Sequence, residues 1–205
     1  MGARLPAAGK SLAQRCAAFK AETRGVAAIE FALVVPLMLA LFFLSLEFSQ
    51  ALETDRKVSR LASQVADLVT QQREMTKEEL RGLMTIGQAT LQPYRRSDPK
   101  ITVTAIQITD EDQPKPKVVW SRALVDGVLV NAETPGELTE VPQSLLVRGS
   151  FLVRANAELD YRPVILWAAG AKEGMGLTAA FDEIAMGERY YLRPRQTPTI
   201  PCSDC

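Results

Sequence analysis

Histidine is absent from this chain of 205 residues. Its absence removes the side chain that most often acts as a general base or a metal ligand in proteins. The sequence also lacks a glycine-rich phosphate-binding loop and any pairing of a nucleophile with a base. We therefore predict that the protein is not an enzyme and carries no cofactor or metal.

The chain has no excess of positive or negative charge, because 24 lysines and arginines balance 24 acidic residues. The balance is uneven along the chain. Residues 1–25 hold one acid, Glu22, so the remainder of the chain is weakly acidic. Nucleic-acid-binding domains carry a basic surface, and we expect no nucleic-acid partner here. The basic residues of this first segment are Arg4, Lys10, Arg15, Lys20 and Arg24.

What the sequence does contain is one long apolar run. Residues 26–46 include a single charged side chain, Glu30. A helix of that length spans ~31 Å, which matches the ~30 Å hydrocarbon core of a bilayer. We interpret residues 26–46 as a transmembrane helix and residues 1–25 as a cytoplasmic basic leader. The positive-inside rule then places everything after Glu47 on the side of the membrane opposite the cytoplasm.

Helix-breaking residues are missing beyond the membrane segment too. No glycine or proline occurs between Leu37 and Gly82, so no signal ends the helix at the membrane surface. Apolar residues continue at helical spacing from Phe48 and Leu52 onward. We predict one continuous helix over about residues 26–72, with its second half projecting from the lipid.

A second, shorter helix is predicted from a capping box. Thr76 and Glu79 have the spacing at which each side chain bonds the other residue's backbone amide. Met75 and Leu80 flank the box as a hydrophobic staple. The helix is expected to end before Pro93, so residues 47–92 form an extramembrane helical region.

From residue 93 onward the apolar period changes to two, which indicates strands. Residues 151–161 alternate most clearly, as expected of an antiparallel sheet with one wet face. Weaker strands are predicted around residues 101–108, 118–124 and 184–192, with a bulge near Ile106. Aromatic side chains expected in the core of this sheet are Trp120, Tyr161 and Trp167.

The predicted fold class is therefore α+β. It comprises a long N-terminal transmembrane helix continuing outward, a short second helix and an antiparallel sheet of about three to five strands. Residues 93–205 form the sheet domain, with a loop at residues 170–176 and a proline-rich tail.

A more specific pattern lies at the start of the apolar run. Gly25 is followed by four small or apolar residues, then by Glu30 and Phe31. This pattern resembles the processing site of type IV prepilins. Together with Pro36, which interrupts the run, it is similar to the TadE-like family, the minor pseudopilins of tight-adherence (Flp-type) pili. The resemblance covers about residues 24–48.

The resemblance implies a minor pilin or pseudopilin that acts in assembly of a tight-adherence type IV pilus for surface attachment. A prepilin peptidase would cut between Gly25 and Val26, and Glu30 would then neutralise the new amine of a neighbouring subunit. Phe31 and Pro36 would take part in helix packing. The implied partners are the peptidase, other pilin and pseudopilin subunits, the pilus assembly platform and membrane lipid.

Other interpretations remain open at this point. The chain fits a periplasmic binding domain on an uncleaved single-pass anchor. It also fits a secreted domain, because Ser49-Gln-Ala51 has the form that signal peptidase accepts. Glu30 is then an acid near the water interface, and Pro36 is an ordinary membrane proline.

The cysteines divide between the two sides of the membrane. Cys16 lies in the leader, whereas Cys202 and Cys205 lie in the outer tail, where an oxidising compartment favours a disulfide. Their spacing also occurs in redox-active and zinc sites, although zinc needs two further ligands. The acids at residues 110–112 indicate a solvated turn or a weak calcium site.

Overall fold

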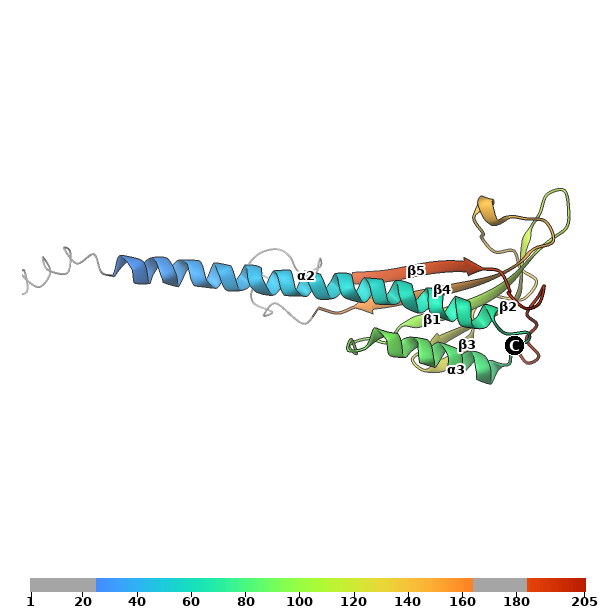
Figure 1. The fold of residues 1–205 in the computed structure, drawn as a ribbon, viewed down its shortest axis with the longest axis horizontal. Coiled ribbons are helices and arrows are strands. Elements are labelled where there is room, and N and C mark those ends of the chain that lie inside the picture. The colour runs from blue at the N-terminus through green and yellow to red at the C-terminus, as the bar shows by residue number, and fades with distance from the viewer. Residues whose placement is uncertain (1–24, 164–183) are drawn as a thin grey trace, which may run out of the picture. The chain divides into compact units, whose positions relative to one another are not determined.

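The computed structural model describes residues 25–163 and 184–205 (Figure 1). The expectations for residues 1–24, for Trp167 and for the loop at residues 170–176 lie outside the described residues. The chain divides into two units, one ending at Leu46 and the other comprising Glu47–Cys205. Its elements are α2 (Val26–Thr70), α3 (Lys77–Gln88), η1 (Ala89–Leu91), β1 (Lys100–Ile108), β2 (Pro116–Val125), β3 (Val128–Asn131), η2 (Gln143–Leu145), β4 (Phe151–Tyr161) and β5 (Ile184–Leu192).

The first unit contains the apolar part of α2. Among the described residues, α2 is the one helix that is long and apolar enough to cross a membrane. The apolar window within it buries none of its residues. This distinguishes it from the core helix of a soluble protein, whose apolar side chains would be covered.

In the second unit, α2 supplies one side of a hydrophobic core. Val58, Leu61, Val65 and Val69 are fully buried and follow one another at intervals of three or four residues, the spacing of one helix face. The helix ends at Thr70, two residues before the predicted end. Burial of this face stabilises the C-terminal part of α2, which would be marginal as an isolated helix.

Helix α3 begins as its sequence predicts. The Glu79 amide donates to the Thr76 hydroxyl at 3.3 Å, and the Thr76 amide donates to the Glu79 carboxylate at 3.0 Å. Both sides of the capping box are therefore present. Helices α2 and α3 lie side by side over the sheet (Figure 1). Gly87 permits this close packing, because a Cβ there would lie 2.7 Å from side-chain carbons of Leu61 and Val65.

The predicted antiparallel sheet is confirmed and has five strands in the order β3-β2-β1-β4-β5. Trp120 and Tyr161 lie in its core, 3% and 0% exposed. Strand β3 was not predicted, although its signal is present in the sequence. Asp126 and Gly127 have φ angles of 50° and 75° and connect β2 to β3. Asp-Gly is the residue pair that such two-residue hairpin turns favour.

The predicted bulge lies on β2 rather than on β1. Ala105 pairs with Trp120 while Ile106 pairs with Val118, which leaves Val119 as the extra residue. Strand β1 keeps a regular register with β4 through the same region. Ile106 is apolar for another reason, since it joins a second cluster of buried residues on the outer face of the sheet.

The expectation of one wet face holds only near the end of β4. Asp160 is exposed there, whereas Arg154 and Thr104 on the same face are 7% and 0% exposed. The segment between β3 and β4 covers them, because Arg154 donates to the Thr139 hydroxyl at 2.9 Å and forms an ion pair with Glu133. This face is therefore a second, partly polar core layer.

Candidate functional site

The predicted processing site lies at the start of α2. The Ile29 amide donates to the Gly25 carbonyl oxygen at 3.1 Å, so Gly25 accepts the first hydrogen bond of the helix. Gly25 is exposed, and a Cβ at this position would meet no atom within 4 Å. Its φ angle is not in the left-handed region that favours glycine. The described fold therefore does not itself demand glycine at residue 25.

Glu30 lies one helical turn after Val26 and is exposed. In the part of the chain that the structure describes, no lysine or arginine pairs with it. A carboxylate within an apolar membrane segment costs up to ~2.5–3.5 kcal/mol at the centre of the bilayer. The cost falls toward the interface, and a cation or a proton from outside the described chain would reduce it further.

The neighbours of Glu30 present a continuous apolar surface. Phe31 is 69% exposed and Leu33 is 72% exposed. Pro36 lies inside α2, where its ring nitrogen cannot donate to the carbonyl of Ala32. These side chains therefore do not pack into a core within the described part of their own unit.

A second carboxylate, Glu47, begins the second unit and has a structural contact there. The Tyr161 hydroxyl donates to Glu47 Oε1 at 2.6 Å. Tyr161 is fully buried and stacks on Tyr94 with 5.2 Å between ring centroids. Burial, and then the hydrogen bond to the Glu47 carboxylate, raise the pKa of Tyr161 to about 12. The phenol therefore stays protonated and fastens the end of β4 to α2.

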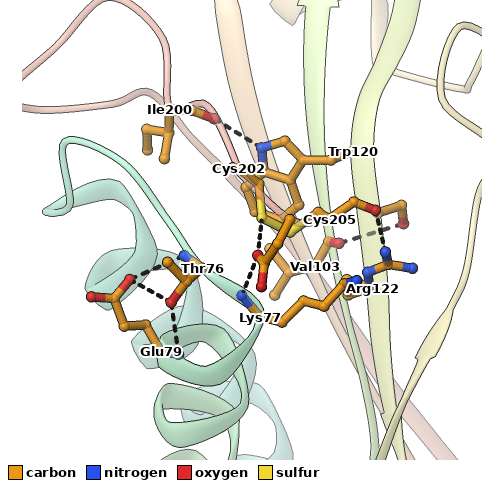
Figure 2. Close-up of a disulfide and its surroundings, with 11 residues drawn as sticks. Thr76, Lys77, Glu79, Val103, Trp120, Arg122, Ile200, Cys202 and Cys205 are labelled. Carbon is orange, nitrogen blue, oxygen red and sulfur yellow. Dashed lines mark hydrogen bonds between the residues drawn. A yellow bond between two sulfur atoms is a disulfide. The ribbon is translucent and has the colours of Figure 1, made fainter.

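The C-terminal tail forms a second structural site, which Figure 2 shows. Cys202 and Cys205 form a disulfide with 5.4 Å between their Cα atoms. Asp204, between them, accepts a hydrogen bond from the Lys77 amide at 2.8 Å. Lys77 is the first residue of α3, so Asp204 satisfies an amide that the capping box leaves free.

Further contacts attach this tail to the sheet and to the segment before α3. The Trp120 indole nitrogen donates to the Ile200 carbonyl at 2.8 Å, and Arg122 donates to the Cys205 carbonyl. The Met75 amide donates to Pro201 at 2.9 Å. The disulfide thus lies in a tail that hydrogen bonds hold against the domain. Neither cysteine stands at the helix start typical of a redox-active pair.

Two metal-binding alternatives are weakened by the contacts. The ligand atoms of Cys202, Asp204 and Cys205 lie within 4.8 Å of one another, but in the disulfide the two sulfurs are not thiolate ligands. At residues 110–112, Arg148 lies 3.3 Å from Asp110 and 3.2 Å from Asp112. Both aspartates therefore already pair with a cationic side chain of the protein.

Comparison with known proteins gives one match. The model of the family described as TadE-like protein matches residues 25–67. The match confirms the resemblance and extends it beyond residue 48, into the part of α2 that packs on the sheet. No curated protein and no solved structure matches the chain.

Proposed function

We propose that this chain, which carries a TadE-like segment, is a minor pilin or pseudopilin of a tight-adherence type IV pilus. A prepilin peptidase processes it between Gly25 and Val26, and it then acts in assembling a pilus used for surface attachment. The observation that carries the proposal is the position of Gly25, Glu30 and Phe31. They lie between a basic leader and an exposed apolar helix, inside the segment matched by the family model.

Processing supplies the partner that Glu30 lacks in the described chain. The cut leaves an ammonium group on Val26, and opposite charges ~4 Å apart attract by ~4 kcal/mol at an effective dielectric constant of ~20. Part of this is lost to desolvation of the two ions. When α2 packs beside a neighbouring pilin helix, the charge pair favours one offset of the two helices along their axes. Glu30, Phe31 and Pro36 are then assembly residues.

Two observations support an inner-membrane location with the large unit in the periplasm. Basic residues precede the apolar run, as expected for its cytoplasmic end. The disulfide between Cys202 and Cys205 needs an oxidising compartment. The partners under this proposal are the peptidase, other pilin and pseudopilin subunits, the assembly platform and lipid.

A periplasmic binding domain on an uncleaved anchor is the alternative. An open groove of about 710 Å³, whose lining includes Ile86, Tyr190 and Leu192, favours it. The secreted form of this alternative is less favoured. A cut after Ala51 falls inside α2 and removes Glu47, which accepts the hydrogen bond of the buried Tyr161.

The N-terminus of the mature protein from its host separates these functions. N-terminal sequencing or intact mass analysis that shows Val26 first supports the pilin function. A retained Met1 supports a tethered domain and contradicts our proposal, and Leu52 first supports a secreted domain. Fractionating sheared pili against membranes then shows whether the processed subunit enters the filament.

A further inference from the structure

Two exposed apolar residues of α2, Phe48 and Leu52, lie at the start of the second unit. Phe48 is 66% exposed and Leu52 is 45% exposed. The two residues are four apart and therefore lie on the same side of the helix. Ala51, one position earlier than Leu52, instead packs partly against the core. Within the described part of the second unit, Phe48 and Leu52 are therefore left largely uncovered.

The membrane does not account for this pair. Residues 26–46 already form ~31 Å of helix, the full thickness of the hydrocarbon core. Phe48 and Leu52 come after that segment and after Glu47. Removing an exposed phenylalanine or leucine side chain from water is favourable. A partner that covers both residues therefore gains a substantial free energy.

The next turn indicates what that partner is. Asp55 and Arg56 are exposed, carry opposite charges and, within the described residues, have no ion pair. Adjacent helix residues do not face each other, so they cannot pair within one helix. The acid three residues before Arg56 is Glu53, whose carboxylate is held by Lys57 at 2.8 Å.

We propose that Phe48, Leu52, Asp55 and Arg56 form a homotypic contact face that binds the same face of a second copy of this chain. The inference rests on the membrane-anchored subunit proposed above, because copies inserted with one topology present their helices in parallel. In a parallel pair, Phe48 and Leu52 pack against their counterparts. Asp55 of each copy then lies beside Arg56 of the other copy, so the face is complementary to itself.

The homotypic contact face adds an extramembrane interface that involves neither Glu30 nor the new N-terminus.

Disulfide crosslinking in intact membranes tests the contact. In the full chain with Cys16→Ser, we expect Phe48→Cys to give a dimer band on a non-reducing gel after mild oxidation. Gln50→Cys is the matched control, because it is also exposed but lies about half a turn away around the helix. Equal crosslinking of both variants, or none for Phe48→Cys, would overturn the proposal. Crosslinking only to another protein would overturn it too.

Charge reversal in the Phe48→Cys background tests the self-complementarity. Asp55→Arg should lower the dimer yield several-fold because it places like charges together. Adding Arg56→Asp should restore the yield by exchanging the two charges. Failure of the double variant to recover contradicts the proposed pairing. Mass analysis of the same samples reports Val26 as the N-terminus independently, so loss of crosslinking is distinguishable from failure of the pilin function.

Discussion

Tyr161 and Glu47 are 114 residues apart in the chain and share a hydrogen bond of 2.6 Å. Tyr161 is the last residue of β4, and Glu47 follows the apolar run of α2 directly. The contact therefore ties the end of β4 to the beginning of the second unit. A hydrogen bond to a charged acceptor contributes ~1.5–3 kcal/mol.

We expect Tyr161→Phe to lower the free energy of unfolding by ~1.5–3 kcal/mol, because Glu47 loses a buried donor. Denaturant unfolding of the purified chain in detergent measures the change. Tyr191→Phe is the control, since its hydroxyl makes a longer bond of 3.3 Å to the Glu140 carbonyl and should matter less. Equal stability of Tyr161→Phe and the wild type would show that this contact does not stabilise the fold.

Alanine substitutions at two glycines of α3 are expected to have opposite effects on stability. Gly87→Ala should destabilise the domain by ~1–3 kcal/mol, because the added Cβ lies 2.7 Å from Leu61 and Val65. Gly82→Ala should be neutral or stabilising by up to ~1 kcal/mol, since a Cβ there meets nothing within 4 Å. Thermal unfolding of both variants checks the difference. Similar effects would contradict the close packing of α2 on α3.

The lowered pKa of Glu133 predicts that the stability of the fold depends on pH. Burial raises its pKa, but hydrogen bonds from Thr139 and Arg154 and the charge of Arg154 outweigh burial, so the pKa is lowered from 4.5. The folded state therefore binds this proton less readily than the unfolded state. The resulting stability is present above the unfolded pKa and is lost as pH falls through the lower, folded pKa.

Glu133→Gln should thus cost ~1–2 kcal/mol at pH 7, less than a fully buried ion pair because Glu133 is partly exposed. The difference from the wild type should shrink as pH falls from ~5 to ~3. Unfolding curves across that range measure it, with the exposed Glu111→Gln as a control expected to change stability by less than ~0.5 kcal/mol. A stability difference between Glu133→Gln and the wild type that stays constant with pH would contradict the lowered pKa of Glu133.

Gly25→Phe should block processing without disturbing the fold. No atom lies within 4 Å of a Cβ at Gly25, so the described chain offers no steric obstacle to the start of the larger side chain. A peptidase that approaches the backbone closely would be obstructed. The measurement is a gel shift or an intact mass that retains the leader. Normal processing of this variant would remove Gly25 from the recognition site.

Glu30→Ala should leave membrane insertion intact and impair pilus assembly, because an apolar residue suits the bilayer but cannot pair with the Val26 amine. Counting pili on cells that carry the variant, alongside membrane fractionation of the subunit, tests both parts. Glu30→Asp is the matched control, since it keeps the charge and shortens the side chain. Normal piliation by Glu30→Ala would exclude Glu30 from assembly.

Local signals were sufficient for the helices and for the resemblance to the TadE-like family. The apolar run, the capping box of Thr76 and Glu79 and the pattern from Gly25 to Phe31 each involve residues close together in the sequence. Such patterns reflect helical geometry or recognition of a short segment, and neither requires knowledge of distant contacts. Strand β3 had a local signal as well, the Asp-Gly turn, and could have been predicted.

The polar contacts across the domain could not be predicted in this way. Arg154 alternates like a solvent-facing residue in its strand, yet the segment carrying Glu133 and Thr139 covers it. In the sequence, Asp204 is an ordinary residue of the C-terminal tail, yet its carboxylate accepts a hydrogen bond from the first amide of α3. In each case the partner lies elsewhere in the chain, and composition or periodicity does not specify which distant groups meet.

The order of residues alone therefore determined the membrane-length helix, its acid at Glu30, the second helix and the alternation of the strongest strand, because each follows from the period of the backbone. Only the tertiary structure decided which face of α2 is covered, why Phe48 and Leu52 stay exposed and which partner Tyr161 finds. Those outcomes depend on how the sheet and α3 pack against α2, and packing joins residues that are far apart in the chain.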